Sequence, residues 1–72
     1  MFYFQKLLKE NHFKNYEIRN YLSLTEPTYK KKLRKGLDFK MSELEEIKSF
    51  FVKKGVIPED FDVGDLLNEV EK

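Results

Sequence analysis

The stretch on which the fold depends is short and reads Thr25-Glu26-Pro27-Thr28-Tyr29-Lys30-Lys31-Lys32-Leu33-Arg34-Lys35-Gly36. Thr25 can cap a helix, because its hydroxyl can accept a backbone N–H of the first turn, and Pro27 falls in that turn, where a missing N–H costs nothing. Gly36 can end the helix in a left-handed conformation. Tyr29 and Leu33 lie four residues apart and therefore share one face. The stretch predicts a short helix that is held to its neighbours by these two side chains.

Basic side chains crowd the second half of this predicted helix. Five of the six residues from Lys30 to Lys35 are basic. On a helical wheel, the face opposite Tyr29 and Leu33 carries Pro27, Thr28, Lys31, Arg34 and Lys35. A run of charge is most often a solvated surface. A helix this short needs its neighbours to be stable, however, so the same face can serve as a recognition element that the rest of the domain presents.

The length and composition predict a single domain, residues 1–72, with a small core. The chain has no cysteine, which excludes disulfides and thiolate zinc sites and fits a reducing cytoplasm. No apolar run approaches the roughly 20 residues that a membrane span needs, and the apolar start lacks the basic flank and the length of a signal peptide. We therefore expect a cytoplasmic protein with no membrane partner.

Charge is distributed unevenly along the chain. The net charge is only +1, which argues against a strong nucleic-acid binder. Residues 1–40, however, carry ten basic and four acidic side chains, whereas residues 41–72 carry four basic and nine acidic ones. One half of the chain can therefore face an anion that the other half would repel.

Two helices are predicted before the basic stretch, over residues 4–11 and 15–22, with Asn15 as a candidate cap of the second. Their helical apolar spacings come from Phe4, Leu7 and Leu8 in the first and from Ile18 and Leu22 in the second. The connection Ser23-Leu24-Thr25 has the length that a helix-turn-helix uses, and Leu24 should fill the space between the helices.

Two more helices are predicted after Gly36. Residues 37–41 alternate apolar and charged side chains, and this favours either an extended loop anchored by Leu37, Phe39 and Met41 or a short strand. Ser42 and Glu45 have the spacing of a capping box, which predicts a helix that ends at Gly55. A last helix is predicted over residues 63–70, capped by Asp62.

Catalytic chemistry finds no support in the sequence. There is no nucleophile–base set, no glycine-rich phosphate loop and no cluster of metal ligands. The only histidine, His12, follows a predicted helix and is expected to be a solvated end residue. We expect no enzyme activity, no cofactor and no metal.

Residues 4–61 resemble the Cro/CI-type helix-turn-helix domain of phage and bacterial repressors. The matching positions are Asn15, where the family often has glutamine, Ile18 and Leu22 in the second helix, Leu24 in the turn, Thr25 and Tyr29 in the third helix, and Leu44, Ile47 and Phe51 in the fourth. The resemblance implies an all-α fold, a compact bundle of five short helices in which the second and third form the helix-turn-helix.

Four residues depart from the family pattern. Arg19 stands where the family usually has alanine, because the two helices cross closely there, and Ser23 replaces the turn glycine. Glu26 and Pro27 stand where small polar or basic residues commonly reach the bases. Glutamate can accept from a cytosine amino group, but it repels phosphates. The expected fold is compatible with these departures, whereas they weaken the expectation of sequence-specific DNA readout.

The size, the lysine-rich composition and the mixed charge also resemble the small modulator-of-repression proteins, which are antirepressors of lactococcal temperate phages. This resemblance implies a regulator of the lysis–lysogeny switch in the host bacterial cytoplasm. Its partner would be the N-terminal DNA-binding domain of the cognate phage repressor, whose operator binding it would block or alter. The low net charge, Glu26 and the acidic second half favour this function, because acidic groups can compete with phosphate for a basic face.

The alternative is a stand-alone Cro-type repressor that binds operator DNA as a dimer, with its third helix in the major groove. Thr28, Lys31 and Lys35 would then lie nearest the bases, and Asn15, Thr25, Lys30 and Arg34 would hold phosphates. Under both hypotheses, the predicted partner- or DNA-binding residues are Asn15, Thr25, Glu26, Thr28, Lys30, Lys31, Arg34 and Lys35.

Overall fold

The structure is a computed structural model that describes residues 1–35 and 39–70. In chain order the elements are α1 (Tyr3–Glu10), α2 (Asn15–Tyr21), α3 (Glu26–Lys35), α4 (Met41–Lys53) and the 3-10 helix η1 (Val63–Leu67). The all-α prediction is confirmed, and the described residues form no strand beyond one isolated bridge between Phe2 and Glu69. None of the helices described is long and apolar enough to cross a membrane.

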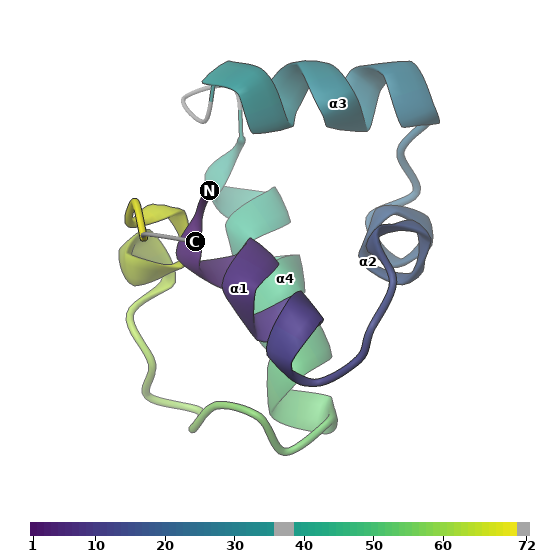
Figure 1. The fold of residues 1–72 in the computed structure, drawn as a ribbon. Coiled ribbons are helices and arrows are strands. Elements are labelled where there is room, and N and C mark those ends of the chain that lie inside the picture. The colour runs from purple at the N-terminus through teal and green to yellow at the C-terminus, as the bar shows by residue number, and fades with distance from the viewer. Residues whose placement is uncertain (36–38, 71–72) are drawn as a thin grey trace.

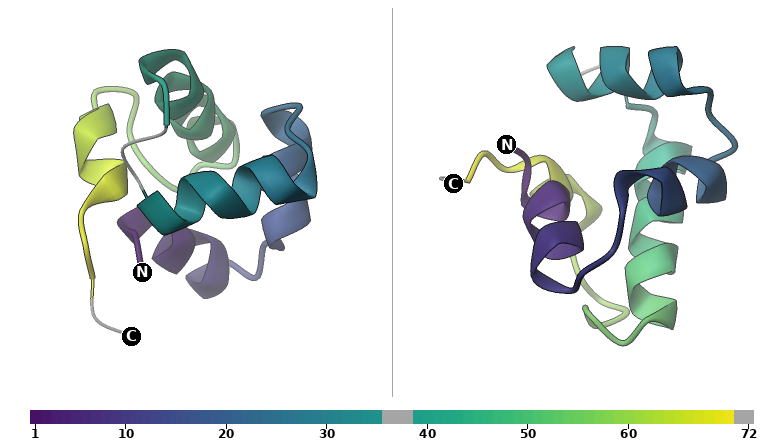
Figure 2. Two further views of the ribbon diagram at one scale, coloured as in Figure 1. Left: turned by 90° about the horizontal axis from the view of Figure 1, so that it is seen from above. Right: turned by 45° about the vertical axis from the view of Figure 1, so that its right-hand side comes forward.

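The helices surround one small core. In Figure 1, α4 stands behind α1, α2 is seen nearly end-on, and α3 lies across the top, steeply inclined to both α2 and α4. Figure 2 shows the same arrangement from above and from the side, with α3 at one end of the molecule. The helix α4 packs against α2 and η1, and α3 packs against α2. The helix α3 therefore leaves much of its surface facing outward.

Three helices begin with the same device. The residue just before the helix has an extended backbone, and its N–H donates to a side chain three residues later: Phe2 to Gln5, Lys14 to Glu17, and Lys40 to Glu43, each at 2.8 Å. This satisfies one backbone donor that the helix itself cannot pair. The sequence predicted other cap residues for α2 and α4 and none for α1.

The predicted capping box of Ser42 and Glu45 is wrong, as is the cap at Asn15. The helix α4 begins at Met41, and Glu43 rather than Glu45 closes its first turn. Glu43 is also held from α3 by the Lys32 ammonium at 3.0 Å, a tertiary contact that the local pattern does not contain. In α2, Lys14 is the cap residue and its N–H donates to the Glu17 carboxylate, whereas Asn15 is already the first helical residue and its amide oxygen accepts from the Tyr29 hydroxyl.

The same three helices also end alike. In the turn after each helix, one N–H bonds to a carbonyl three residues back and the next N–H bonds to a carbonyl five residues back, as in a Schellman motif. The residue in the left-handed conformation is His12 after α1, Ser23 after α2 and Gly55 after α4, with φ of 62°, 59° and 73°. An apolar residue follows each of them, so each turn directs the chain back onto the core. Gly55 was predicted; the ending of α3 at Gly36 lies outside the described residues.

The core is apolar throughout. Its buried members are Phe4, Leu7, Leu8, Ile18, Leu22, Tyr29, Phe39, Leu44, Ile47, Phe50, Phe51, Ile57 and Leu66. Phe39 is the anchor that residues 37–41 were expected to supply, whereas Met41 is 61% exposed and belongs to α4, so its predicted anchoring role is wrong. Leu37 lies outside the described residues. Leu24 is half-buried and packs against the core, as predicted.

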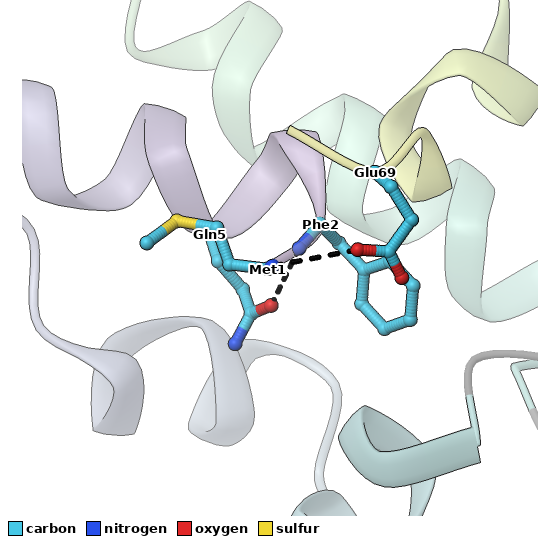
Figure 3. Close-up of polar contacts among 4 residues, drawn as sticks. All are labelled: Met1, Phe2, Gln5 and Glu69. Carbon is cyan, nitrogen blue, oxygen red and sulfur yellow. Dashed lines mark hydrogen bonds and ion pairs between the residues drawn. The ribbon is translucent and has the colours of Figure 1, made fainter. Parts of the chain in front are cut away.

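The last helix differs from its prediction. It is a 3-10 helix that ends at Leu67, instead of a helix over residues 63–70, although Asp62 does cap it by accepting the Gly64 N–H at 2.9 Å. Beyond it the chain turns extended and pairs with the N-terminus: the Tyr3 N–H donates to the Asn68 carbonyl and the Val70 N–H to the Met1 carbonyl. The N-terminal ammonium also lies 3.4 Å from Glu69 (Figure 3). This pairing competes with helix propagation and ends η1 early.

Candidate interaction surface on α2 and α3

The sequence-predicted binding residues gather on one side of the molecule. All lie in α3, at the start of α2 or in the turn between them. Asn15, Thr25, Glu26, Thr28, Lys30, Lys31 and Arg34 are exposed. Lys35 is the last residue of α3, and its side chain lies outside the described part of the structure.

A cleft of about 200 Å³ separates α2 from α3. Its lining residues are Asn15, Tyr16 and Arg19 from α2 and Glu26, Tyr29, Lys30 and Leu33 from α3. The cleft brings together three of the predicted residues, Asn15, Glu26 and Lys30. The other four exposed ones, Thr25, Thr28, Lys31 and Arg34, are not part of its lining. The predicted set therefore divides between a cleft and an outer surface of α3.

Tyr29 closes the inner end of the cleft. Its side chain is 3% exposed, and its hydroxyl donates to the Asn15 amide oxygen over a long 3.5 Å. Burial raises the pKa of the Tyr29 phenol well above its ordinary value, although the nearby Arg19 charge acts in the opposite direction. Tyr29 is therefore a neutral, packed wall of the cleft at any physiological pH.

Glu26 is balanced by two cations at the outer end of the cleft. One carboxylate oxygen lies 3.2 Å from the Lys30 ammonium, one helical turn away, and the other lies 3.8 Å from the Arg19 guanidinium. The acidic residue that departs from the Cro/CI pattern therefore does not stand as an isolated negative charge. The surface around it has mixed charge.

The basic run of α3 is not one continuous face. Lys32 points toward α4, where its ammonium lies 3.0 Å from the Glu43 carboxylate and both side chains are 13% exposed. Burial alone would raise the pKa of Glu43, but hydrogen bonds from the Lys40 N–H and the Lys32 ammonium outweigh it, so the pKa lies below its ordinary value. Lys32 therefore helps to fasten α3 to α4, and the cations that face outward are Lys30, Lys31 and Arg34.

Four cleft residues were not in the predicted site: Tyr29 and Leu33, which were predicted as core residues, and Tyr16 and Arg19. Tyr16 is 56% exposed, one of the two large apolar side chains on the described surface, and Arg19 was noted only as a departure from a family pattern. A signal for Tyr16 was present, because it lies two residues before the core residue Ile18 and therefore off the core face of α2. Arg19 belongs to the cleft because it packs against α3, and the sequence gives no indication of this contact.

The described residues hold no group of three or more His, Cys, Asp or Glu side chains that could bind a metal ion. Comparison with protein-family models, curated proteins and solved structures finds no match to this chain.

Proposed function

We propose that the chain is a phage-type transcriptional regulator of Cro/CI-like helix-turn-helix fold that acts as an antirepressor. In this proposal α2 and α3 form the helix-turn-helix, and the surface around their cleft binds the N-terminal DNA-binding domain of a cognate repressor. The bound repressor is then blocked from its operator, or its binding there is altered.

The turn between α2 and α3 supports the helix-turn-helix assignment. Ser23 holds a φ of 59°, the conformation for which the family uses glycine. Leu24 packs against the core, the Thr25 carbonyl accepts the Tyr29 N–H as the first bond of α3, and Tyr29 is buried as the first core residue of that helix. The Thr25 hydroxyl itself donates to the Thr28 hydroxyl at 2.9 Å, so the threonine occupies the cap position through its backbone.

The observation that carries the antirepressor proposal is the mixed character of the α2–α3 surface. Aromatic side chains line a cleft whose rim carries an acid paired with two cations. Protein interfaces combine aromatic residues, arginine and complementary charges in this way, whereas a surface that follows a phosphate backbone is more uniformly basic. Exposed acids outside this surface would also hinder approach to DNA; they are Glu10, Glu45, Glu46, Glu59, Asp60, Asp62, Asp65 and Glu69.

Operator binding by this chain alone is the second candidate, and one observation favours it. Lys30, Lys31 and Arg34 are all exposed on α3, so cations are available to phosphates along the helix. In that case α3 would enter the major groove, and a dimer would be needed to span two half-sites.

A gel-shift experiment separates the two candidates. The purified chain, alone and mixed with the repressor from the neighbouring gene, is incubated with the intergenic DNA between the two genes. Loss or alteration of the repressor's shift, with no shift by the chain alone, supports the antirepressor. A shift by the chain alone that falls steeply with added salt supports the Cro-type repressor instead.

The double variant Lys31→Ala with Arg34→Ala sharpens this test. Both side chains are exposed on α3, so we expect thermal stability to stay nearly unchanged. Any DNA shift by the chain alone should weaken and become less sensitive to salt, because two phosphate contacts are removed. An unaffected DNA shift would move the DNA-binding surface away from α3.

A further inference from the structure

Arg19 occupies an unusual position between α2 and α3. Its side chain is 25% exposed and lines the cleft, yet its Nε–H is buried and has no hydrogen-bond partner. A buried N–H without an acceptor is costly and therefore rare in folded proteins.

The ion pair that Arg19 makes with Glu26 inside the chain is weak. The distance of 3.8 Å between its guanidinium and Glu26 is too long for a hydrogen bond, whereas Lys30 holds the same carboxylate at 3.2 Å. Glu26 is 60% exposed, so this pair is screened by water. The planar fork of arginine, which can hold one carboxylate through two parallel N–H groups, is therefore left largely unused.

Apolar surface adjoins this guanidinium. The exposed ring of Tyr16 and the half-buried Leu33 line the same cleft, with Tyr29 behind them. Tyrosine and arginine are the residue types that most often dominate protein interfaces, where they act from pockets that exclude water. The cleft therefore offers one cationic fork beside an apolar wall.

We propose that this cleft is the anchor site for the partner protein and that it takes one carboxylate side chain of the partner onto Arg19. The incoming carboxylate displaces Glu26, which stays with Lys30, and accepts from the terminal N–H groups of the Arg19 guanidinium, because the Nε–H itself is buried. Apolar atoms beside that carboxylate pack on Tyr16 and Leu33. The charges favour this occupant, because Arg19 and Lys30 outnumber the single acid of the rim. That the partner is a repressor rests on the proposed function, whereas the carboxylate site is argued from the residues of the cleft alone.

The direct test uses nuclear magnetic resonance on the full chain. The probe is an acetylated and amidated tripeptide of leucine, glutamate and leucine, and the matched neutral probe has glutamine in the middle. We expect the glutamate tripeptide to shift the Arg19 Nε–H signal and the Tyr16 ring signals saturably, and the glutamine tripeptide to do so much less. Equal responses to the two probes overturn the proposal. A larger response to inorganic phosphate than to the glutamate tripeptide also overturns it, and indicates a nucleic-acid site.

Two variants with opposite effects strengthen the test. Arg19→Lys keeps the charge but lacks Nε–H and the fork, and should weaken tripeptide binding by roughly tenfold. Glu26→Gln removes the internal competitor and should tighten binding. The control is Lys9→Gln, which removes an exposed cation from α1 and should leave binding unchanged. If Arg19→Lys fails to fold, Glu26→Gln alone decides, because unchanged or weaker binding in that variant overturns the displacement of Glu26.

The repressor then distinguishes this inference from the proposed function. Tripeptide binding without any repressor binding supports the cleft as a carboxylate site and removes the antirepressor proposal. Repressor binding that keeps its wild-type affinity in Arg19→Lys supports the antirepressor and overturns the cleft as its anchor.

Discussion

At the scale of single residues, the backbone of His12 and Ser23 carries strain that glycine would not. Each sits in the left-handed turn after a helix, with φ near +60°, where a Cβ approaches the carbonyl oxygen that follows. Gly55 occupies the equivalent position after α4 without this penalty. The positions are equivalent in hydrogen bonding and differ only in the side chain, so their energetic difference can be measured directly.

We expect Ser23→Gly to raise the free energy of unfolding by about 1 kcal/mol, because it removes the steric cost of the left-handed conformation. Urea denaturation measures the change. The control is Asn20→Gly in the right-handed helix α2, which should lower stability by about 0.3 kcal/mol instead, the difference in helix propensity between asparagine and glycine. A Ser23→Gly variant that is destabilised to the same extent would show that the turn does not hold Ser23 in the left-handed region.

Glu43 is a second residue whose contribution can be isolated, through its pH dependence. Its pKa is lower in the folded chain than in the unfolded one, so the ionised form stabilises the fold. That stabilisation is fully present above the ordinary pKa of a glutamate, about 4.3, and is lost as the pH falls through the lower folded pKa.

We expect Glu43→Gln to lower stability at neutral pH by about 1 kcal/mol, since it loses the negative charge that pairs with the Lys32 ammonium, although its amide oxygen can still accept the Lys40 N–H. The difference between variant and wild type should shrink as the pH falls below about 4, where the wild-type carboxyl becomes protonated. Thermal unfolding at a series of pH values gives the comparison. A difference that stays constant down to the acid limit would contradict a lowered pKa.

At the scale of elements, α3 is attached to the rest of the molecule by few side chains. Tyr29 enters the core, Leu33 is half-buried, and Lys32 reaches Glu43 on α4. A helix of this length is marginal by itself, so these contacts and its capping decide whether it forms. The helix that presents the candidate site is thus attached to the core through one buried and one half-buried apolar side chain among the residues described.

We expect Tyr29→Ala to destabilise the domain by about 3 kcal/mol or more, because it removes a buried aromatic ring. Leu33→Ala should cost less, about 1–2 kcal/mol, because that side chain remains partly exposed. Tyr29→Phe is the matched control and should have little effect, since only the 3.5 Å hydrogen bond to Asn15 is lost. The reverse order of Tyr29→Ala and Leu33→Ala in urea denaturation would show that α3 docks through its other end.

At the scale of the whole molecule, the two ends of the described chain hold each other. Residues 1–3 pair with residues 68–70 through backbone hydrogen bonds of 2.8 and 2.9 Å and one bridge, and the two ends of the chain lie near each other in Figure 1. Leu66 is fully buried just before this segment. The pairing therefore keeps η1 seated on the core and closes the side of the molecule next to α1.

We expect truncation after Leu67 to lower the free energy of unfolding by about 1–3 kcal/mol, because it removes these hydrogen bonds while leaving Leu66 in place. Hydrogen exchange gives a local measurement: the Tyr3 amide should be protected in the full chain and exchange rapidly in the truncated one. The Leu8 amide, inside α1, serves as the reference. Equal exchange of the Tyr3 amide in both chains would exclude a stable terminal pairing.

By itself, the sequence determined that this chain forms short helices around an aromatic and aliphatic core. The helical spacings of Phe4, Leu7 and Leu8, and of Leu44, Ile47 and Phe51, were sufficient, because local sequence distance fixes which side chains share a face. It also determined which residues of α3 and early α2 are exposed and polar, and so outlined the candidate surface.

Contacts between elements could be learned only from the tertiary structure. Lys32 reaches from α3 to Glu43, the residue that also caps α4, and residues 68–70, which follow η1, pair with the N-terminus. Arg19 and Glu26 form an ion pair across the cleft although they lie seven positions apart in the chain. The side chain of Lys32, unlike those of Lys30, Lys31 and Arg34, points toward α4 and pairs with Glu43. These contacts join residues on different elements, and the local patterns of the sequence carry no information about which elements will touch.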